Sequence, residues 1–392
     1  MKDMKEKIIE IVNAIGAELD QLSYSIYNAP ELGGREEKAC AWHTELLRKH
    51  GFSVETPFSG VPTGFKAVYD SKKPGLSIAF LAEYDALPGI GHGCAHNLLG
   101  TVSTGAGIAL RRIIDGLGGR VIVFGTPAEE TNGAKVIYAE NGEFNGVDIA
   151  MIAHPGSRNT KSASSLALEP VQFEFFGKTS HAASSPEEGV NALDAALVTM
   201  TAVNALREHI RSDSRVHGIV ANGGEAANIV PEYSKLQYYV RSTKKAYNQE
   251  LLERIKNCAR AGALASGCEL KISKFEYSYD NLVTNETLSD TFNKAIFEIA
   301  GIVMEEPPKS AASLDTGQVS QICPAIHPDF DITQRNASVM CHSRELADAT
   351  ITDFAKQQMR HVISAFTLTA AEIMENPELY NKIRQEFLNA EK

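Results

Sequence analysis

The chain has 392 residues, which exceeds the size at which a single hydrophobic core stops growing, so two domains are expected. Its apolar share of 43% and charged share of 22% are those of an ordinary soluble globular protein, and they exclude collagen-like, disordered and disulfide-scaffold classes. Acidic residues outnumber basic ones by 49 to 38 and no dense Lys/Arg run occurs, so a nucleic-acid partner is not expected.

The sequence predicts a cytoplasmic protein. Its first residues, MKDMKEKIIEIVNAIG, alternate charges with a helical apolar stripe and lack the uninterrupted apolar stretch of a signal peptide. No window approaches the ~18 apolar residues of a membrane span, so no membrane association is expected. The six cysteines are scattered without a CxxC pair, which disfavours both a zinc ribbon and a secreted disulfide framework.

The first part of the chain has the pattern of alternating helices and buried strands. Apolar residues recur every three to four positions over 4–27 and again over about 35–50, which predicts two amphipathic helices. Short continuous apolar runs follow at 77–82, 120–125 and 147–153, and such runs are typical of strands buried on both faces of a parallel sheet. Helical segments lie between these runs, so the pattern predicts a βαβαβ arrangement.

From about residue 166 the pattern changes to alternating strands and two long helices. Runs such as SLALEPVQFEFFGK and SKLQYYVRS alternate apolar and polar residues, which is typical of antiparallel strands with one exposed face. Helical patterns resume after residue 285, and QVSQICPAI has the composition of a further apolar strand. The sequence therefore predicts an α/β domain at 1–166 and 284–392, with a mostly parallel sheet flanked by helices, and an inserted α+β domain at 167–283.

Each of the three buried runs ends in residues that can bind a ligand. Glu83 and Asp85 follow the first run, Glu129 and Glu130 the second, and His154 the third. In open α/β sheets ligands bind outside the carboxyl ends of the strands, so three strands direct acids and an imidazole to one crevice. Any one of these acids could instead cap a helix or face solvent, but their coincidence at three strand ends favours a site.

The loop LAEYDALPGIGHGCAHN, residues 81–97, adds sulfur and nitrogen donors at the same place. Cys94 and His96 are two residues apart, and in an extended loop such residues point to one side and can reach one ion. A thiolate, imidazoles and a carboxylate suit Zn²⁺, Mn²⁺, Co²⁺ or Ni²⁺. Two alternatives stay open for Cys94, a small buried apolar residue or a nucleophile activated by a histidine.

Six ordered motifs resemble one known family over nearly the whole chain. They are AEYDALPGIGHGCAHN, TPAEET, MIAHPG, GKTSHAASSPEEGVNALDAAL, NIVPEYSKLQYYVRS and SLDTGQVSQICPAIHP. The chain resembles the aminoacylase, carboxypeptidase G and dipeptidase family of co-catalytic metallopeptidases, and within it the branch of aminobenzoyl-glutamate hydrolases and β-alanyl-lysine-type dipeptidases. The resemblance implies a phosphorylase/hydrolase-like catalytic domain with an inserted ferredoxin-like lid through which two chains form a homodimer.

The resemblance also implies the parts of a two-metal site. Asp85 would orient the ligands from behind, Glu129 would be the general base, and Glu83 stands where most of the wider family has a histidine ligand. Two divalent ions per chain are implied, Zn²⁺ or Mn²⁺ with Co²⁺ or Ni²⁺ as possible substitutes. Their ligands would be Cys94, His96, Glu130, His154 and His327.

Four further positions match residues that act on the substrate in this family. His181 matches a lid histidine that reaches the active site of the other subunit, and Asn228 and Arg241 match lid residues that hold the substrate's terminal carboxylate. His342, in VMCHSREL, matches a histidine that recurs in the pocket. From their local sequence alone, His181 would be a solvated loop residue and Arg241 one half of a surface ion pair.

The chain departs from the branch at one place. It has Gly93-Cys94-Ala95-His96 where the branch usually has Ala-Cys-Gly-His. Alanine adopts a positive φ less easily than glycine, so the exchange bears on the geometry of the loop, while the ligand spacing is kept. His92 has no firm role and is expected beside the ligand set.

The implied reaction is hydrolysis of an amide bond in a small substrate with a free C-terminal carboxylate, such as a dipeptide or aminobenzoyl-glutamate. N-acyl amino acids, the substrates of aminoacylases, are the alternative. A cysteine amidase is one rival interpretation. A non-catalytic binding protein on the same fold is another, and it is disfavoured because the base and every ligand are present.

Overall fold

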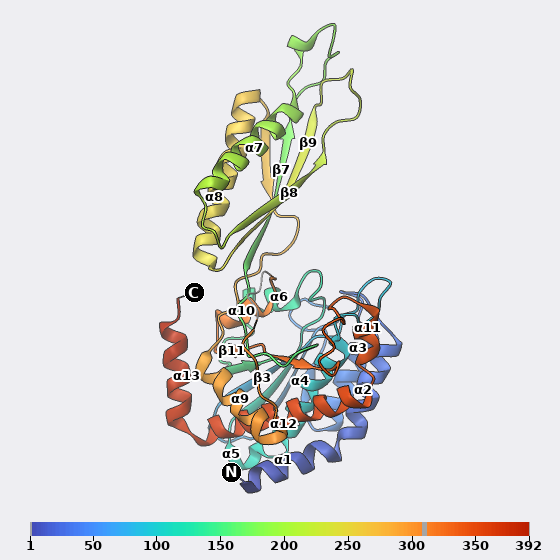
Figure 1. The fold of residues 1–392 in the computed structure, drawn as a ribbon, viewed down its shortest axis with the longest axis vertical. Coiled ribbons are helices and arrows are strands. Elements are labelled where there is room, and N and C mark those ends of the chain that lie inside the picture. Colours follow the sequence, from blue (N-terminus) through green and yellow to red (C-terminus); the bar gives the residue numbers. More distant parts are fainter. Residues whose placement is uncertain (1, 308–311, 392) are drawn as a thin grey trace. The chain divides into compact units, whose positions relative to one another are not determined.

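The computed structural model describes residues 2–307 and 312–391, and the chain divides into two compact units. The first unit comprises residues 2–164, 282–307 and 315–391, and the second comprises residues 165–281 with 312–314. Figure 1 shows that each unit has a sheet and helices of its own. The second unit is thus an insertion in the first. Its main segment, residues 165–281, compares with the predicted insertion at 167–283.

A six-stranded sheet with the order β1-β2-β4-β3-β5-β11 forms the centre of the first unit. The strands β4, β3, β5 and β11 are parallel, and β2 is antiparallel to both its neighbours, so the predicted mostly parallel sheet is confirmed. The bounds are β1 (Ser53–Glu55), β2 (Phe65–Asp70), β3 (Ser77–Ala82), β4 (Arg120–Gly125), β5 (Ile149–Met151) and β11 (Ala325–Ile326). A separate parallel pair joins β6 (His154–Gly156) to β12 (Asp329–Asp331).

Strand β3 is buried on both faces, as its continuous apolar sequence predicts. Ile78, Phe80 and Ala82 belong to one apolar cluster, and the alternate residues Ala79 and Leu81 belong to another. Because successive side chains of a strand point to opposite faces, the two clusters lie on the two sides of the sheet. The sheet is therefore the middle layer of the unit, and its polar groups are found where the strands end.

Helices cover both faces of this sheet (Figure 1). One cluster includes residues of α1 (Lys2–Ala14), α2 (Gly16–Asn28), α3 (Glu37–Lys49), α4 (His96–Arg111), α5 (Ile114–Leu117), α9 (Glu286–Ala300), α11 (Arg344–Ala349), α12 (Asp353–Glu375) and α13 (Pro377–Asn389). The other includes residues of α6 (Ala134–Glu140) and α10 (Thr316–Ser320). Among the described residues, none of these helices combines the length and the apolarity that crossing a membrane needs.

Glycines let α4 approach the sheet closely. A Cβ at Gly100 would lie 2.4 Å from the carbonyl oxygen of Glu83, and one at Gly107 would lie 2.3 Å from Cγ2 of Val123. Contacts this short exclude any side chain at either position. The close packing fixes His96, the first residue of α4, beside the carboxyl ends of β3 and β4.

Two local predictions are wrong, and a third is correct about the strand but not about its length. The predicted helix 4–27 is two helices that meet at Ile15, where the guanidinium of Arg360 lies over Gly16 and the apolar period continues unbroken across the junction. The segment QVSQICPAI contributes the helix α10 and only two strand residues, because a short apolar run fits either structure. The run 147–153 provides the short strand β5, and a second strand, β6, begins at His154.

The second unit is a four-stranded antiparallel sheet with the order β10-β7-β9-β8, packed against two helices. Burial alternates strictly along β9, so one face of the sheet meets the helices and the other does not, as predicted for this segment. The bounds are β7 (Ala167–Phe176), α7 (Ala192–Leu206), β8 (Arg215–Asn222), β9 (Tyr233–Ser242), α8 (Lys245–Ser266) and β10 (Glu269–Ser273). The short 3₁₀ helices η1 (Pro186–Glu188) and η2 (Arg207–His209) flank α7.

Candidate active site

A single buried carboxylate connects the loops that follow β3 and β4. Oδ1 of Asp85 lies 3.0 Å from Nδ1 of His96, and Oδ2 of Asp85 accepts a hydrogen bond of 3.0 Å from the backbone N–H of Glu130. Asp85 and His96 are both buried. Asp85 thus orients one predicted ligand through its ring and the other through its backbone, which is the positioning role expected for it.

Cys94, His96 and His154 form the first group of donors. Their ligand atoms all lie within 4.8 Å of one another, and Sγ of Cys94 is 3.4 Å from Nε2 of His154. Nδ1 of His154 lies 2.8 Å from the carbonyl oxygen of Pro155, which can only accept, so this nitrogen carries the ring proton and Nε2 presents its lone pair. The group brings together Cys94 and the first residues of α4 and β6, which are distant in the sequence.

Glu83, His96 and Glu129 form a second group whose ligand atoms also lie within 4.8 Å of one another. Oε2 of Glu83 is 3.3 Å from Nε2 of His96. Because His96 belongs to both groups, the two sets of donors are adjacent parts of one site. The predicted base Glu129 therefore lies beside the predicted ligands.

The donor chemistry of these groups fits divalent metal ions. Nε2 of His96 and Oε1 of Glu130 are both buried and make no hydrogen bond in the described part of the chain, and their neighbours are the ion-pair partners Glu83 and His342. A buried polar atom without a partner is costly unless another group satisfies it. A set made of thiol, imidazole and carboxylate donors suits Zn²⁺ or a similar borderline ion.

Electrostatics within the site differ between its histidines. Burial opposes protonation of His96, but the carboxylate of Asp85 outweighs it and raises the pKa of His96 well above its usual value. Burial, with a smaller effect of the nearby His154, lowers the pKa of His327 to about 4. Burial and the carboxylates of Glu83 and Asp315 raise the pKa of Glu129 well above its usual value. The site holds more carboxylates than cationic side chains, and an excess of this sign favours a bound cation.

A buried ion cluster lies directly behind Glu83. Nζ of Lys135 is 2.7 Å from Oε1 of Glu83 and 2.6 Å from Oδ1 of Asp315, and all three side chains are buried. Burial alone would lower the pKa of Lys135, but the carboxylates of Asp315 and Glu83 raise it above its usual value, so the lysine is charged. Lys135 therefore neutralises Glu83 inside the protein.

Three further histidines of the sequence analysis lie in the first unit, His327, His342 and His92. The backbone N–H of His327 donates to Oγ of Ser162, and its ring centroid is 5.8 Å from that of His154. Nε2 of His342 lies 3.1 Å from Oε1 of Glu130, so this histidine is in ion-pair range of a predicted ligand. Nε2 of His92 lies 3.1 Å from the carbonyl oxygen of Ile26 in α2, a contact that anchors the loop on this helix.

Sequence reasoning missed Lys135, Asp315 and Cys341. Sγ of Cys341 lies 3.5 Å from Sγ of Cys94, and Cys341 directly precedes His342. The shared hydrogen bond raises the pKa of the Cys94 thiol and lowers that of Cys341 to about 6. The signal for Cys341 was its position beside His342, whereas nothing local distinguishes Lys135 from a solvent-exposed helix lysine.

The positions of the small residues Gly93 and Ala95 in the loop 81–97 have a structural explanation. Ala95 adopts a left-handed conformation with φ of 61°, the conformation that glycine would adopt more easily. Gly93 is needed for space, since a Cβ there would lie 2.7 Å from Cγ2 of Ile90 and 3.1 Å from the carbonyl oxygen of Ser343. The chain thus places its glycine where the packing is tightest and accepts strain at Ala95.

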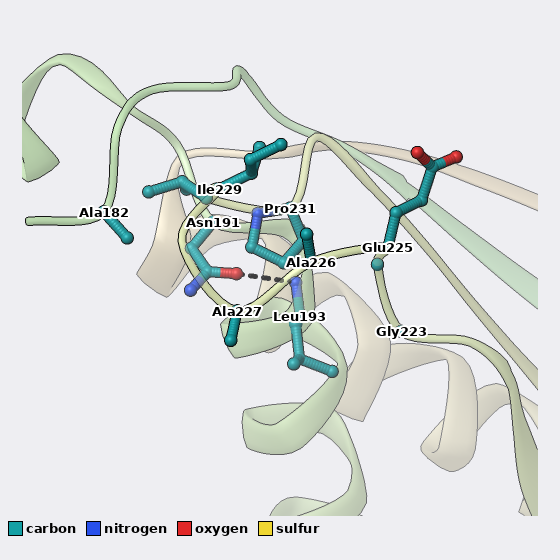
Figure 2. Close-up of a pocket in the computed structure, with 11 residues that line it drawn as sticks. Ala182, Asn191, Leu193, Gly223, Glu225, Ala226, Ala227, Ile229 and Pro231 are labelled. Atoms are coloured by element: carbon teal, nitrogen blue, oxygen red, sulfur yellow. Dashed lines mark hydrogen bonds between the residues drawn. The ribbon is translucent and has the colours of Figure 1, made fainter.

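The remaining predicted residues belong to the second unit. His181 and Asn228 are not buried, and their chain neighbours line a pocket of about 440 Å³ (Figure 2). One side of this pocket is the start of α7, where Oδ1 of Asn191 accepts from the backbone N–H of Leu193. Arg241 is partly buried, and its Nη1 donates to Oγ of Ser313. Its Nε has no hydrogen-bond partner in the described residues, so the guanidinium keeps donor capacity for a ligand.

Replacing Gly93 by alanine should distort the loop 81–97. The added methyl group forces Ile90 and the segment at Ser343 apart, and overpacking of this kind costs about 1–3 kcal/mol. We expect a lower melting temperature and weaker Zn²⁺ binding in a titration. In the control Ala95→Gly, relief of strain opposes the loss of a buried methyl group, so little change is expected. A larger loss in the control than in Gly93→Ala would contradict this account of the loop.

Removing the charge of Lys135 should destabilise the first unit. Lys135→Met leaves Glu83 and Asp315 buried without their partner, and breaking a buried ion pair in this way costs about 3–5 kcal/mol. The free energy of unfolding in urea measures the loss. Lys356→Met, which removes a surface pair with Asp353, is the matched control and should change little. Equal small effects of both substitutions would show that the cluster is not important for stability.

Comparison with known proteins places the chain in a family. A family model described as a peptidase dimerisation domain matches residues 167–266. The chain is 35% identical to the Xaa-Arg dipeptidase of Mus musculus, over 98% of this chain and 92% of that protein. It is 30% identical to one of the p-aminobenzoyl-glutamate hydrolase polypeptides of Escherichia coli, over 76% of this chain and 65% of that protein.

A solved structure of similar fold comes from Bacillus subtilis and is described as a dinuclear metal binding peptidase. It superimposes with a TM-score of 0.69 at 17% identity, over 92% of this chain and 99% of that one. Together with the sequence identities, the α/β sheet and the inserted four-stranded domain, these findings show that the chain belongs to the M20 peptidase family and is a hydrolase of the dipeptidase and carboxypeptidase type.

Proposed function

We propose that the chain hydrolyses the amide bond of a small substrate that ends in a free carboxylate, and that it uses two divalent metal ions to do so. The observation that carries the proposal is a pair of donor groups that share His96, one with Cys94 and His154 and the other with Glu83 and Glu129. Cys94, His96, Glu130, His154 and His327 would hold the ions, with His342 beside Glu130. Zn²⁺ or Mn²⁺ fits this donor set, and Co²⁺ or Ni²⁺ would substitute.

When bound, such ions polarise the amide carbonyl and make a water more acidic. Glu129 accepts the proton of the attacking water, a role supported by its place beside the donors Glu83 and His96. The protonated carboxyl group of Glu129 then delivers this proton to the leaving amine. Asp85 keeps His96 and Glu130 in place throughout, since it bonds the ring of one and the backbone of the other.

The second unit would provide recognition of the substrate. Arg241 has an unsatisfied Nε donor, and a guanidinium binds a carboxylate more specifically than an ammonium group does. Asn228 stands in the chain between Ala227 and Ile229, which line the pocket of Figure 2, and it would add an amide donor. Relatives named for the hydrolysis of Xaa-Arg dipeptides and of p-aminobenzoyl-glutamate support a substrate with a free C-terminal carboxylate. The higher identity and coverage of the dipeptidase favour a dipeptide.

His181 would stabilise the developing oxyanion from the other subunit of a homodimer. Nδ1 of His181 accepts from the backbone N–H groups of Ala183 and Ser184, so the ring proton lies on Nε2, which can donate. The edge strand β8 exposes Ile219 by 61% and Val220 by 42%, and an exposed apolar edge strand suits pairing with a second chain. A monomeric mass in solution would contradict this part of the proposal.

The proposed location of the protein is the cytoplasm. Its six cysteines carry no disulfide, which suits a reducing compartment.

Two adjacent glutamates should respond differently to the same substitution. Glu129→Gln removes the base and should lower kcat by ~10²–10⁴ while the metal content stays near that of the wild type. Glu130→Gln removes a ligand and should lower the metal content itself. Both are measured by steady-state kinetics and by elemental analysis of the dialysed protein. Normal turnover of Glu129→Gln would refute the proposed base.

A substrate panel tests the substrate class. Dipeptides with a basic C-terminal residue, aminobenzoyl-glutamate and N-acyl amino acids are compared with Mn²⁺ and Zn²⁺ supplied in turn. We expect the highest kcat/KM for the dipeptides, and a loss of about 10- to 100-fold when their carboxylate is amidated or when Arg241 is replaced by Met. Arg254→Met, on an exposed face of the same unit, is the control and should behave as the wild type.

Two outcomes of this panel would exclude the proposal. Equal rates on amidated and free dipeptides would exclude carboxylate recognition. Activity that persists after chelation but is lost on thiol alkylation would favour a cysteine amidase.

A further inference from the structure

A second thiol lies next to the predicted metal ligand Cys94. Sγ of Cys94 is 3.5 Å from Sγ of Cys341 and 3.4 Å from Nε2 of His154, so it has a sulfur neighbour as well as a nitrogen neighbour. Both cysteines are free thiols. Cys341 comes from a loop 247 residues further along the chain, and the predicted ligand set does not include it.

The backbone holds these two loops together. The N–H of His342 donates a hydrogen bond of 2.9 Å to the carbonyl oxygen of Gly93, so the residue after one cysteine is bonded to the residue before the other. Gly93 has no room for a side chain because Ile90 and Ser343 pack against it. The proximity of the two sulfur atoms is therefore a consequence of the packing of two loops and not of the rotamers of two side chains alone.

The separation of the sulfur atoms is short enough for a disulfide. An S–S bond measures ~2.05 Å, so the two sulfur atoms need to approach by about 1.5 Å, which small side-chain rotations can supply. The two thiols also differ in access, since Cys94 is 6% exposed and Cys341 is an exposed residue. An oxidant in solution therefore meets Cys341 first.

We propose that Cys94 and Cys341 form a reversible disulfide that removes Cys94 from metal binding, so that a peroxide switches the site off and a thiol reductant switches it on. The peroxide oxidises the Cys341 thiol to a sulfenic acid and is itself reduced to water. The thiol of Cys94 then attacks the sulfenic sulfur, the S–S bond forms, and the hydroxyl group leaves as a second water. Two thiols are oxidised, and one peroxide takes up the two electrons and the two protons.

The switch rests on the proposed function, in which Cys94 is a metal ligand. A metal ion needs the thiolate of Cys94, and the disulfide consumes it, so metal and disulfide exclude one another. Bound metal should protect the pair from oxidation. Oxidation of the metal-free protein should lower Zn²⁺ affinity by at least the ~10-fold that loss of a supporting group in a metal site costs.

The test counts thiols in the full chain, before any substrate is used. Metal-free wild type is treated with hydrogen peroxide, unfolded, and titrated with a thiol reagent. We expect two fewer free thiols than in the untreated protein, a peptide linked through Cys94 and Cys341 in the mass spectrum, and full recovery with dithiothreitol. The same treatment of Zn²⁺-loaded protein should leave the thiol count unchanged. A full thiol count in the oxidised metal-free protein would overturn the proposal, and so would equal oxidation with and without Zn²⁺.

Two variants separate the disulfide from other damage. Cys341→Ser has no partner for Cys94 and should form no linked peptide, and its Zn²⁺ binding after peroxide should equal its own value before treatment. Cys258→Ser, which removes a thiol of the second unit, should still form the disulfide. Loss of Zn²⁺ binding by oxidised Cys341→Ser would overturn the switch. A thiol count that behaves as expected, with no hydrolysis of any panel substrate, would instead refute only the proposed substrate class.

Discussion

The carboxylate of Asp85 is the interaction on which the rest of the site depends. It is buried just after a strand that is itself buried on both faces, and each of its oxygen atoms holds a different loop. One oxygen fixes the ring of His96 at the start of α4, and the other fixes the backbone of Glu130 after β4. A buried carboxylate is costly unless its hydrogen bonds are satisfied, so the same condition that stabilises Asp85 also sets the geometry of two predicted ligands.

Lys135 reduces the repulsion among the buried carboxylates of the same region. Glu83, Glu129 and Asp315 are acids within one small volume, and without a positive charge their mutual repulsion would oppose folding of the metal-free protein. The Lys135 ammonium pairs with Glu83 and Asp315 at the same time. The charge of the buried Glu83 is therefore balanced inside the protein.

The parts of this protein that could be predicted from sequence are those with a local signal. The apolar runs 77–82 and 120–125 predict parallel strands, and the polar residues that follow them predict a site at one edge of the sheet. The break at Ile15 could not be predicted, because the apolar period is the same on both sides of it. The roles of Lys135 and Cys341 could not be predicted for a different reason. Their partners are distant in sequence, so only the folded chain brings them together.

Strained backbone conformations occur at three loops of the site. Ala95, Ala128 and His342 have φ between 61° and 63°, a region that costs a residue with a Cβ roughly 1–2 kcal/mol. Each is held by a hydrogen bond from outside its own turn or by the adjoining helix. The N–H of Ala128 donates to the buried Glu36, and the N–H of His342 donates to Gly93. Ala95 directly precedes α4.

These positions flank Cys94 and His96, Glu129, and Cys341. Strain at residues next to reactive groups persists only where the surrounding structure over-determines it. The surrounding packing therefore holds these donors in place. It also keeps the two sulfur atoms at the short distance on which the proposed switch relies.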